Sequence, residues 1–390
     1  MVKILTYEQI DQHQWQELVQ SSATATWFQT PEAYKFYASV EEMLPFAVGV
    51  VESQECDSEA MGYETSETES SVHTPSLKGV CVGYITKETN TIKQYLTCRA
   101  IIIGGPLLAE DISATALAEL LNAVAQCKVE SVKCNDMENS SADPNASTPY
   151  TLHPTQTEAS TPYTLHPTPI YIESRNFHDY SKWRNIFEAN GFAYQPHLNF
   201  HVDTSSIEVV DKNLGKSRKR DIRTTIRDGV TPVYQPTIEQ VKQYYQILQN
   251  LYATKVKTPL FSWNFFEQLH RTEHARFILT EYQGRIIGGT VCVELPNRAL
   301  YEWFACGEDG VYDHIYPSCY ATYLGIKYAA ESGCQIFDMM GAGKPEEAYG
   351  VRDFKAKFGG ELVEHGRFLC VRKPLLYWIG KTGVKLLKRK

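Results

Sequence analysis

The residues best placed to do chemistry lie near the C-terminal end of the sequence. Asp338 ends the strand-like run Gln335–Asp338, and Lys355 follows within the motif FKAKFGG at residues 354–360. A fixed ammonium stabilises an oxyanion or a phosphate, and a nearby carboxylate can hold an amine or orient the lysine. Lys355 and Asp338 are therefore candidate catalytic residues for a reaction that develops negative charge. A helix-capping lysine and a buried structural carboxylate are the alternatives.

The rest of the sequence narrows the kind of catalysis. It contains no Ser-His-Asp or Cys-His arrangement at a recognisable spacing, which favours direct attack by the amine over a covalent enzyme intermediate. Ten cysteines are scattered without a C-x-x-C pair, so no metal site is expected. The segment Gly341–Pro345 could hold a phosphate through its backbone N–H groups. It lacks the P-loop pattern, so a nucleoside triphosphate site is not expected.

These residues must be positioned by the elements around them, and the pattern of elements repeats. Each half of the chain reads as strand, two helices, three strands, helix, strand, helix and strand. In the first half, the third of the central strands is expected near residues 94–103. Two tandem copies of one α+β unit with mixed, largely antiparallel sheets account for this order. It is the order of a GCN5-related N-acetyltransferase (GNAT) unit.

The repeat predicts two domains. We expect an N-terminal GNAT-like domain at residues 1–205 and a C-terminal one at residues 206–390, which carries the site between strand 335–338 and Lys355. Two segments are expected to be loop insertions. Residues 52–76 are acidic and rich in Ser and Thr, and residues 130–169 contain the sequence STPYTLHPT twice.

Composition and charge exclude several classes of protein. The 390 residues are 43% hydrophobic and 22% charged, which excludes a wholly disordered chain. No run of 18 apolar residues predicts a spanning helix, and the N-terminus lacks the apolar stretch of a signal peptide, so a cytoplasmic protein is expected. The net charge of −8 argues against general coating of nucleic acid.

Two basic segments stand out against the acidic background. The helix expected at residues 211–228 suits a tRNA backbone or a pyrophosphate, or is a solvated helix that packs between the domains. The tail at residues 373–390 combines apolar, aromatic and cationic residues. It suits peripheral contact with an anionic membrane, or it packs on the first domain.

Several motifs, taken together, resemble those of one family. They are WFQTP at 27–31, GGP at 104–106, KRDIR at 219–223, FDMMG at 337–341 and FKAKFGG at 354–360. In their order and spacing they resemble the Fem family, aminoacyltransferases that add amino acids to peptidoglycan precursors from aminoacyl-tRNA. The resemblance covers nearly the whole chain apart from the insertions, and it implies a tandem pair of GNAT-like domains. The coiled-coil arm of some members is missing, because helix 211–228 leads directly into a strand.

The resemblance also implies roles for individual residues. Lys355 matches a lysine that binds the aminoacyl donor and stabilises negative charge, while Tyr312 and Lys35 match residues that contact the acceptor. The remaining candidates for substrate binding are Tyr316, Tyr349, Arg352 and Lys344. Phe261 and Phe265 stand where relatives that bind a nucleotide-linked precursor have Arg and Tyr, which suggests a more apolar or different acceptor.

The sequence therefore predicts a FemAB-like N-acyltransferase acting on an amine of a peptidoglycan-type precursor. The acceptor is a small or lipid-linked molecule, and the donor is a co-substrate, aminoacyl-tRNA or acyl-CoA, without a tightly bound cofactor. His314–Ser318 replaces the usual GNAT pyrophosphate loop, which weighs against acyl-CoA. An acyl-CoA-dependent GNAT enzyme with another amine substrate and a catalytically silent binding module are the alternatives.

Overall fold

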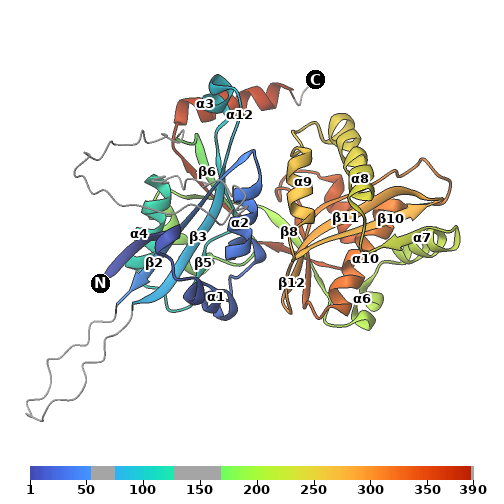
Figure 1. The fold of residues 1–390 in the computed structure, drawn as a ribbon, viewed down its shortest axis with the longest axis horizontal. Coiled ribbons are helices and arrows are strands. Elements are labelled where there is room, and N and C mark those ends of the chain that lie inside the picture. Colours follow the sequence, from blue (N-terminus) through green and yellow to red (C-terminus); the bar gives the residue numbers. More distant parts are fainter. Residues whose placement is uncertain (54–74, 127–167, 388–390) are drawn as a thin grey trace, which may run out of the picture.

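The computed structural model describes residues 1–53, 75–126 and 168–387, with side chains to residue 382. The two predicted insertions, at residues 52–76 and 130–169, lie almost wholly outside these ranges. The described chain forms two mixed sheets with helices packed on them, so the predicted α+β class is confirmed (Figure 1). Among the described residues, no helix has the length and apolar character needed to cross a bilayer.

The N-terminal copy of the repeat follows the predicted order with three short additions, α3, β5 and β7. Its elements are β1 (Val2–Thr6), α1 (Gln12–Ser21), α2 (Pro31–Ser39), β2 (Met43–Glu52), β3 (Ser76–Thr86), α3 (Thr91–Thr97), β4 (Ala100–Gly104), β5 (Leu107–Leu108), α4 (Ala114–Gln126), β6 (Tyr171–Asn176), α5 (Arg184–Ala189), β7 (Ala193–Gln195) and β8 (Leu198–Asp203). The strand predicted at 94–103 begins only at Ala100. A short helix precedes it, because the Asn90 side chain accepts from the Lys93 N–H and caps α3.

The C-terminal copy repeats the same order after two added helices. Its elements are α6 (Ile207–Asn213), α7 (Lys216–Arg227), β9 (Thr231–Val233), α8 (Ile238–Leu251), α9 (Trp263–His270), β10 (Ala275–Tyr282), β11 (Arg285–Leu295), β12 (Ala299–Gly307), α10 (Pro317–Glu331), β13 (Ile336–Gly341), α11 (Gly350–Ala356), β14 (Glu361–Glu364), β15 (Arg367–Val371) and α12 (Pro374–Leu387). Local signals fix several of these elements. Gln283 and Gly284, both at positive φ, make the two-residue turn that joins β10 to β11.

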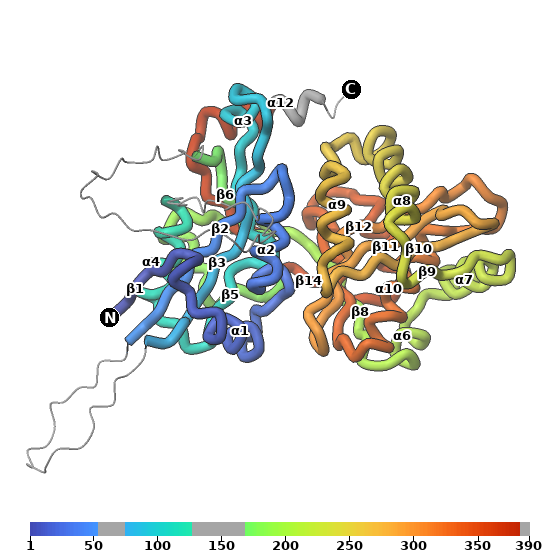
Figure 2. Tube along the Cα trace, in the orientation of Figure 1, coloured from blue at the N-terminus to red at the C-terminus, as the bar shows by residue number. Residues whose placement is uncertain are grey.

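The two copies exchange their last strands. The first sheet has the order β1-β2-β3-β4-β6-β15-β7, with β5 on β3, and the second has β14-β8-β13-β12-β11-β10-β9. Strand β8 ends the N-terminal copy but pairs with β13 and β14, whereas β15 ends the C-terminal copy and pairs with β6 and β7. Figure 2 shows the red end of the chain beside the green β6.

This exchange changes where one structural unit ends and the next begins. A boundary between residues 205 and 206 leaves β8 with the first unit, although it is an inner strand of the second sheet. The physical reason is that alternation of apolar residues specifies a strand but not the sheet in which it pairs. By pairing, the first unit comprises residues 1–195 with β15, and the second begins at β8.

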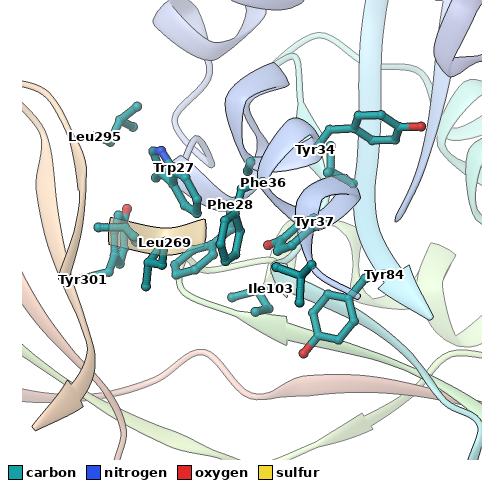
Figure 3. Packing of buried hydrophobic residues seen from close by; sticks show 14 of the residues in the cluster. Trp27, Phe28, Tyr34, Phe36, Tyr37, Tyr84, Ile103, Leu269, Leu295 and Tyr301 are labelled. Carbon is teal, nitrogen blue, oxygen red and sulfur yellow. The ribbon is translucent and has the colours of Figure 1, made fainter. Parts of the chain in front are cut away.

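An aromatic core joins the two units. Trp27 and Phe28, in a short 3₁₀ turn before α2, are fully buried and point toward the second sheet (Figure 3). Phe28 packs against Tyr301 and Trp303 of β12, with ring centroids 5.6 and 4.9 Å apart. Rings of this size bury a large apolar area, so the contact holds the two sheets in a defined relation.

Candidate functional site

The site begins where two parallel strands of the second sheet diverge. Strands β12 and β13 pair only from Ala299–Tyr301 to Ile336–Asp338, and beyond this point their backbones no longer pair with each other. The equivalent strands of the N-terminal copy, β4 and β6, stay paired from Ala100 to Gly104. Among the described residues, the C-terminal copy therefore has a gap between these two strands, and the N-terminal copy does not. The C-terminal copy is also the one in which the sequence predicts the site.

A cavity of about 300 Å³ lies at this gap. Its walls come from both sheets: β4, β6 and β15 of the first, and β8, β12, β13 and α11 of the second. The polar side chains that line it are Arg175, Asn176, His197, Asn199, Glu302, Lys355 and Arg367. The cavity thus lies between the units, and not within the second domain alone as the sequence predicted.

Lys355 lies on the wall of this cavity. Strand β13 is bulged between Asp338 and Gly341, with Met340 at a φ of 55°, so its backbone carbonyls turn away from the sheet ladder. The Lys355 ammonium donates to the carbonyl oxygens of Met339 and Gly341, the latter at 2.9 Å. Burial lowers the pKa of Lys355, while Glu302 and Asp338 act in the opposite direction. The lysine therefore has both a structural role and access to the cavity.

Glu302 of β12 is a buried residue that also lines this cavity. Its side chain accepts a hydrogen bond of 3.2 Å from the Thr290 hydroxyl, and the residue is only 6% exposed. Burial raises the pKa of Glu302, and the positive charge of Lys355 lowers it in part. A buried carboxyl with a raised pKa that lines a cavity is a candidate to accept and return a proton.

The first sheet supplies positive charge to the same cavity. Arg175 and Arg367 both line it, and both donate to the buried Glu173 carboxylate, at 2.8 and 2.9 Å. Burial alone raises the pKa of Glu173, but the two guanidinium groups lower it to about 2. One carboxylate fixes two arginines, so the pair forms a rigid cationic wall that suits an anionic group.

His197 lines the cavity between these arginines and β13. Its Nδ1 lies 2.6 Å from the Gly343 carbonyl oxygen, which orients the ring. Burial and the positive charge of Arg367 lower the pKa of His197 to about 4. The ring is therefore neutral near pH 7, so the cationic character of the cavity comes from Lys355 and the two arginines.

Asp338 is not among the residues that line the cavity. It is 1% exposed, and its Oδ1 accepts from the Met340 N–H at 2.6 Å, which fixes the bulge of β13. Its Oδ2 lies 3.3 Å from Nε2 of His201. Burial lowers the pKa of His201, but the interaction with Asp338 outweighs it and raises the pKa overall. These contacts are those of a positioning residue that shapes the carbonyls bound by Lys355.

The six predicted substrate-binding residues also lie outside the cavity wall. Three of them shape the loop between β13 and α11: Arg352 donates to the carbonyls of Ala342, Lys344 and Pro345, Lys344 lies 3.7 Å from Glu347, and Tyr349 packs on Gly343. The others are spread further. Lys35 is exposed on α2, the Tyr312 hydroxyl contacts Glu308, and the Tyr316 N–H donates to Thr225 at the start of α10. Their roles in binding remain predictions.

The two phenylalanines of the FKAKF motif hold the basic helix α7. The Arg218 guanidinium lies over the rings of Phe354 and Phe358, 4.4 and 5.1 Å from their centroids. The N-terminus of α7 meets the same motif, because the Gly215 N–H donates to the Lys357 carbonyl at 3.0 Å. Figure 1 places α7 on the side of the second unit away from the first, so it does not pack between the domains.

The exposed face of α7 is a cationic surface. Its members line a shallow hollow: Lys216, Lys219, Arg220, Arg223, Thr224 and Arg227. Asp221 neutralises part of this charge through Arg220, at 3.0 Å, and Asp228 does so through Arg227, at 2.8 Å. Enough positive charge remains to suit a polyanion, and the helix is anchored to the motif that carries Lys355.

Sequence reasoning missed Glu302 and the arginine pair. Glu302 is the one charged residue in the apolar run Leu300–Phe304, which is a weak sign of function within a buried strand. Arg175 and Arg367 are nearly two hundred positions apart in the sequence, and only the pairing of β6 with β15 brings them together. No local signal predicts that pairing.

Comparison with known proteins agrees with the tandem fold. The FemAB family model matches residues 264–385, from α9 into α12. None of the curated proteins matches the chain by sequence. The crystal structure of FemX superimposes with a TM-score of 0.61 at 12% identity, over 97% of this chain and 99% of FemX.

Two further structures extend the comparison. A conserved protein of unknown function from Bacteroides thetaiotaomicron VPI-5482 gives a TM-score of 0.51 at 8% identity, over 95% of this chain and all (100%) of that one. A tandem GNAT protein from the clavulanic acid biosynthesis pathway gives 0.48 at 9% identity, over 95% and 98% of the two chains.

The two-unit fold places the chain in the class of tandem α+β proteins to which FemX belongs. Within it, the family match of the C-terminal copy and the fold shared with FemX over the whole chain confirm the predicted resemblance. The C-terminal copy thus matches the FemAB family model, and the chain as a whole shares its fold with FemX.

Proposed function

We propose that this protein transfers an aminoacyl group to an amine of a peptidoglycan-type cell-envelope precursor. The observation that carries the proposal is the placement of Glu302 and Lys355 in one cavity, at the gap between β12 and β13. The FemAB match to the copy that contains this gap supports it.

The reaction joins an amine nitrogen to the carbonyl carbon of an activated ester. The nitrogen attacks, the carbonyl oxygen becomes an oxyanion, and the C–O bond to the donor breaks as the amide forms. Glu302 accepts a proton from the attacking amine, and the leaving hydroxyl takes up a proton. Two N–H groups of the Lys355 ammonium are bound by Met339 and Gly341, and the third is available to the oxyanion.

The cationic wall supplies a binding site for an anionic group of the acceptor. Arg175 and Arg367 present guanidinium groups that Glu173 already orients, so a phosphate can bind without reorganising them. A phosphate-linked precursor, free or attached to a lipid, fits this wall. Peripheral contact of the tail with the membrane belongs to the same proposal, since it brings the cavity to lipid-linked acceptors.

The start of α10 favours an aminoacyl-tRNA donor over acyl-CoA. A pyrophosphate needs free N–H groups at a helix N-terminus. Here the Tyr316 N–H donates to the Thr225 hydroxyl at 3.0 Å, and the Ser318 N–H donates to the Asp309 carboxylate at 3.1 Å. A carboxylate at this position repels a second anion, whereas the basic face of α7 suits a tRNA backbone.

The experiment measures amide formation in a single turnover with charged tRNA, acyl-CoA and phosphate-linked amine acceptors offered separately. Glu302→Gln keeps the size of the side chain and an oxygen for the Thr290 hydroxyl, so the melting temperature should hold. We expect amide from charged tRNA, and a loss of about 10²- to 10⁴-fold in the variant. Glu188→Gln, on the exposed face of α5, is the matched control. A wild-type rate in Glu302→Gln, or product from acyl-CoA alone, contradicts the proposal.

Lys355→Ala is a less selective probe. Because the ammonium binds two backbone carbonyls of the β13 bulge, its removal lowers stability as well as turnover. Lys355→Arg keeps the charge and the donors, so it separates these effects better.

A further inference from the structure

We propose that α3 and the first turns of α12 together form a docking face for an anionic lipid bilayer. Both helices carry large apolar side chains in the exposed i, i+3, i+4 pattern of one helix face. On α3 these are Ile92, Tyr95 and Leu96, which are 72, 55 and 51% exposed. On α12 they are Leu375, Trp378 and Ile379, which are 71, 65 and 51% exposed.

The two helices are held next to each other although they lie far apart in the sequence. The Ile170 N–H donates to the Cys98 carbonyl just after α3, and the N–H groups of Arg372 and Lys373 donate back to the Ile170 carbonyl. The Lys373 ammonium lies 4.4 Å from the ring centroid of Tyr95. Figure 1 shows α3 and α12 together at one end of the molecule. The apolar residues therefore form one surface.

The orientation of α12 is fixed by a contact with the first unit. Tyr377 packs edge-to-face on Tyr171 of β6, with ring centroids 5.5 Å apart. Leu375, Trp378 and Ile379 lie on the opposite face of the helix and stay exposed, while α3 buries none of its residues. Two neighbouring helices that leave six large apolar side chains in solvent indicate a surface that is covered in use.

The positive charge of α12 and the residues around it favours an anionic lipid surface as the partner of this face. Residues 372–390 contain seven Lys or Arg and no Asp or Glu, in a chain of net charge −8. Lys373 lies over the ring of Tyr95, and Lys381 lies over the ring of Tyr377 at the edge of this face. Aromatic rings next to cations are typical of interfacial helices. The acidic remainder of the protein is repelled by an anionic bilayer, which favours approach by this face alone.

The test is co-sedimentation of the full chain with phosphatidylcholine vesicles, with or without about a third phosphatidylglycerol. We expect binding to the anionic vesicles that salt weakens. Trp378→Ser and Ile92→Ser should each weaken it by about tenfold or more. Lys381→Gln should weaken it about fivefold, and only with anionic vesicles. Val311→Ser, at a site in the other unit that is 64% exposed, is the matched control and should bind as wild type.

Three results would overturn the inference. One is no binding to anionic vesicles, and another is an Ile92→Ser variant that binds as wild type, which would remove α3 from the face. The third is a wild-type protein that does not bind vesicles and forms a dimer that Trp378→Ser dissociates. A second copy of the chain would then cover the face formed by α3 and α12. This inference rests on the proposed function, in which the tail contacts the membrane, and deepens it by naming the face that α3 and α12 form. Vesicle binding requires neither donor nor acceptor. It can therefore fail while aminoacyl transfer is intact, and transfer can fail while vesicle binding is intact.

Discussion

The exchange of strands makes a prediction about Phe368. This residue belongs to β15 at the end of the C-terminal copy, yet its ring stacks on Phe187 of the first unit, with centroids 4.0 Å apart. It is 1% exposed and lies in the core beneath α4 and α5. Phe368→Ala should therefore destabilise the first unit. Truncation of a buried Phe leaves a cavity and costs about 3–5 kcal/mol.

Urea denaturation gives the size of this loss, and hydrogen exchange read by mass spectrometry gives its place. We expect faster exchange in α4, β6 and α5, which are up to about 250 positions earlier in the sequence. Phe200→Ala is the reciprocal variant, because Phe200 of β8 lies in the core of the second unit. It should instead raise exchange in β13, β14 and α10. If Phe368→Ala accelerates exchange only within residues 336–371, the strand exchange is wrong.

Three further predictions follow from local geometry and pKa shifts. Burial lowers the pKa of His178 to about 4, so the unfolded chain binds a proton that the folded chain excludes between pH 6.5 and 4. Stability should therefore fall as pH falls through this window, by up to about 3 kcal/mol, and urea midpoints at several pH values should show a smaller fall in His178→Gln. A methyl group at Gly105, which has a φ of 85°, meets the Tyr180 hydroxyl at 2.6 Å, so Gly105→Ala should lower stability by about 2 kcal/mol or more in thermal melts; an unchanged melting temperature would exclude this packing. Burial raises the pKa of Glu302, so amide formation should rise with pH as this carboxyl deprotonates, and the rise should vanish in Glu302→Gln; the same profile in both proteins would show that another group titrates.

Much of the fold follows from local signals in the sequence. Apolar periodicity and capping residues specify the helices, as at α2, where Pro31 begins the helix and the Thr30 hydroxyl accepts from the Ala33 N–H. The repeat of element order predicts two copies of one unit. The pairing partners of β8 and β15 do not follow, since a strand has the same alternation in either sheet.

The site was predicted in part, for a related reason. Lys355 stands in a recognisable motif, and the structure brings it to the cavity wall. Glu302 does not belong to a recognisable motif. It lines the cavity because β12 and β13 stop pairing near it, and the sequence does not predict where that pairing stops. Asp338 was expected at the end of a strand but lies inside β13 (Ile336–Gly341), where its carboxylate fixes the bulge and contacts His201. Residue type and spacing predict which groups are present, whereas tertiary pairing decides which of them share a cavity.

The most direct test of the account is mass spectrometry of cell-envelope precursors from a strain that lacks this gene. We predict precursors lighter by one aminoacyl residue, restored by the wild-type protein and by Glu188→Gln. Glu302→Gln, present at the same level, should leave the lighter species in place. Unchanged precursors in the deletion strain, or full restoration by Glu302→Gln, would contradict transfer in the cavity between β12, β13 and Lys355.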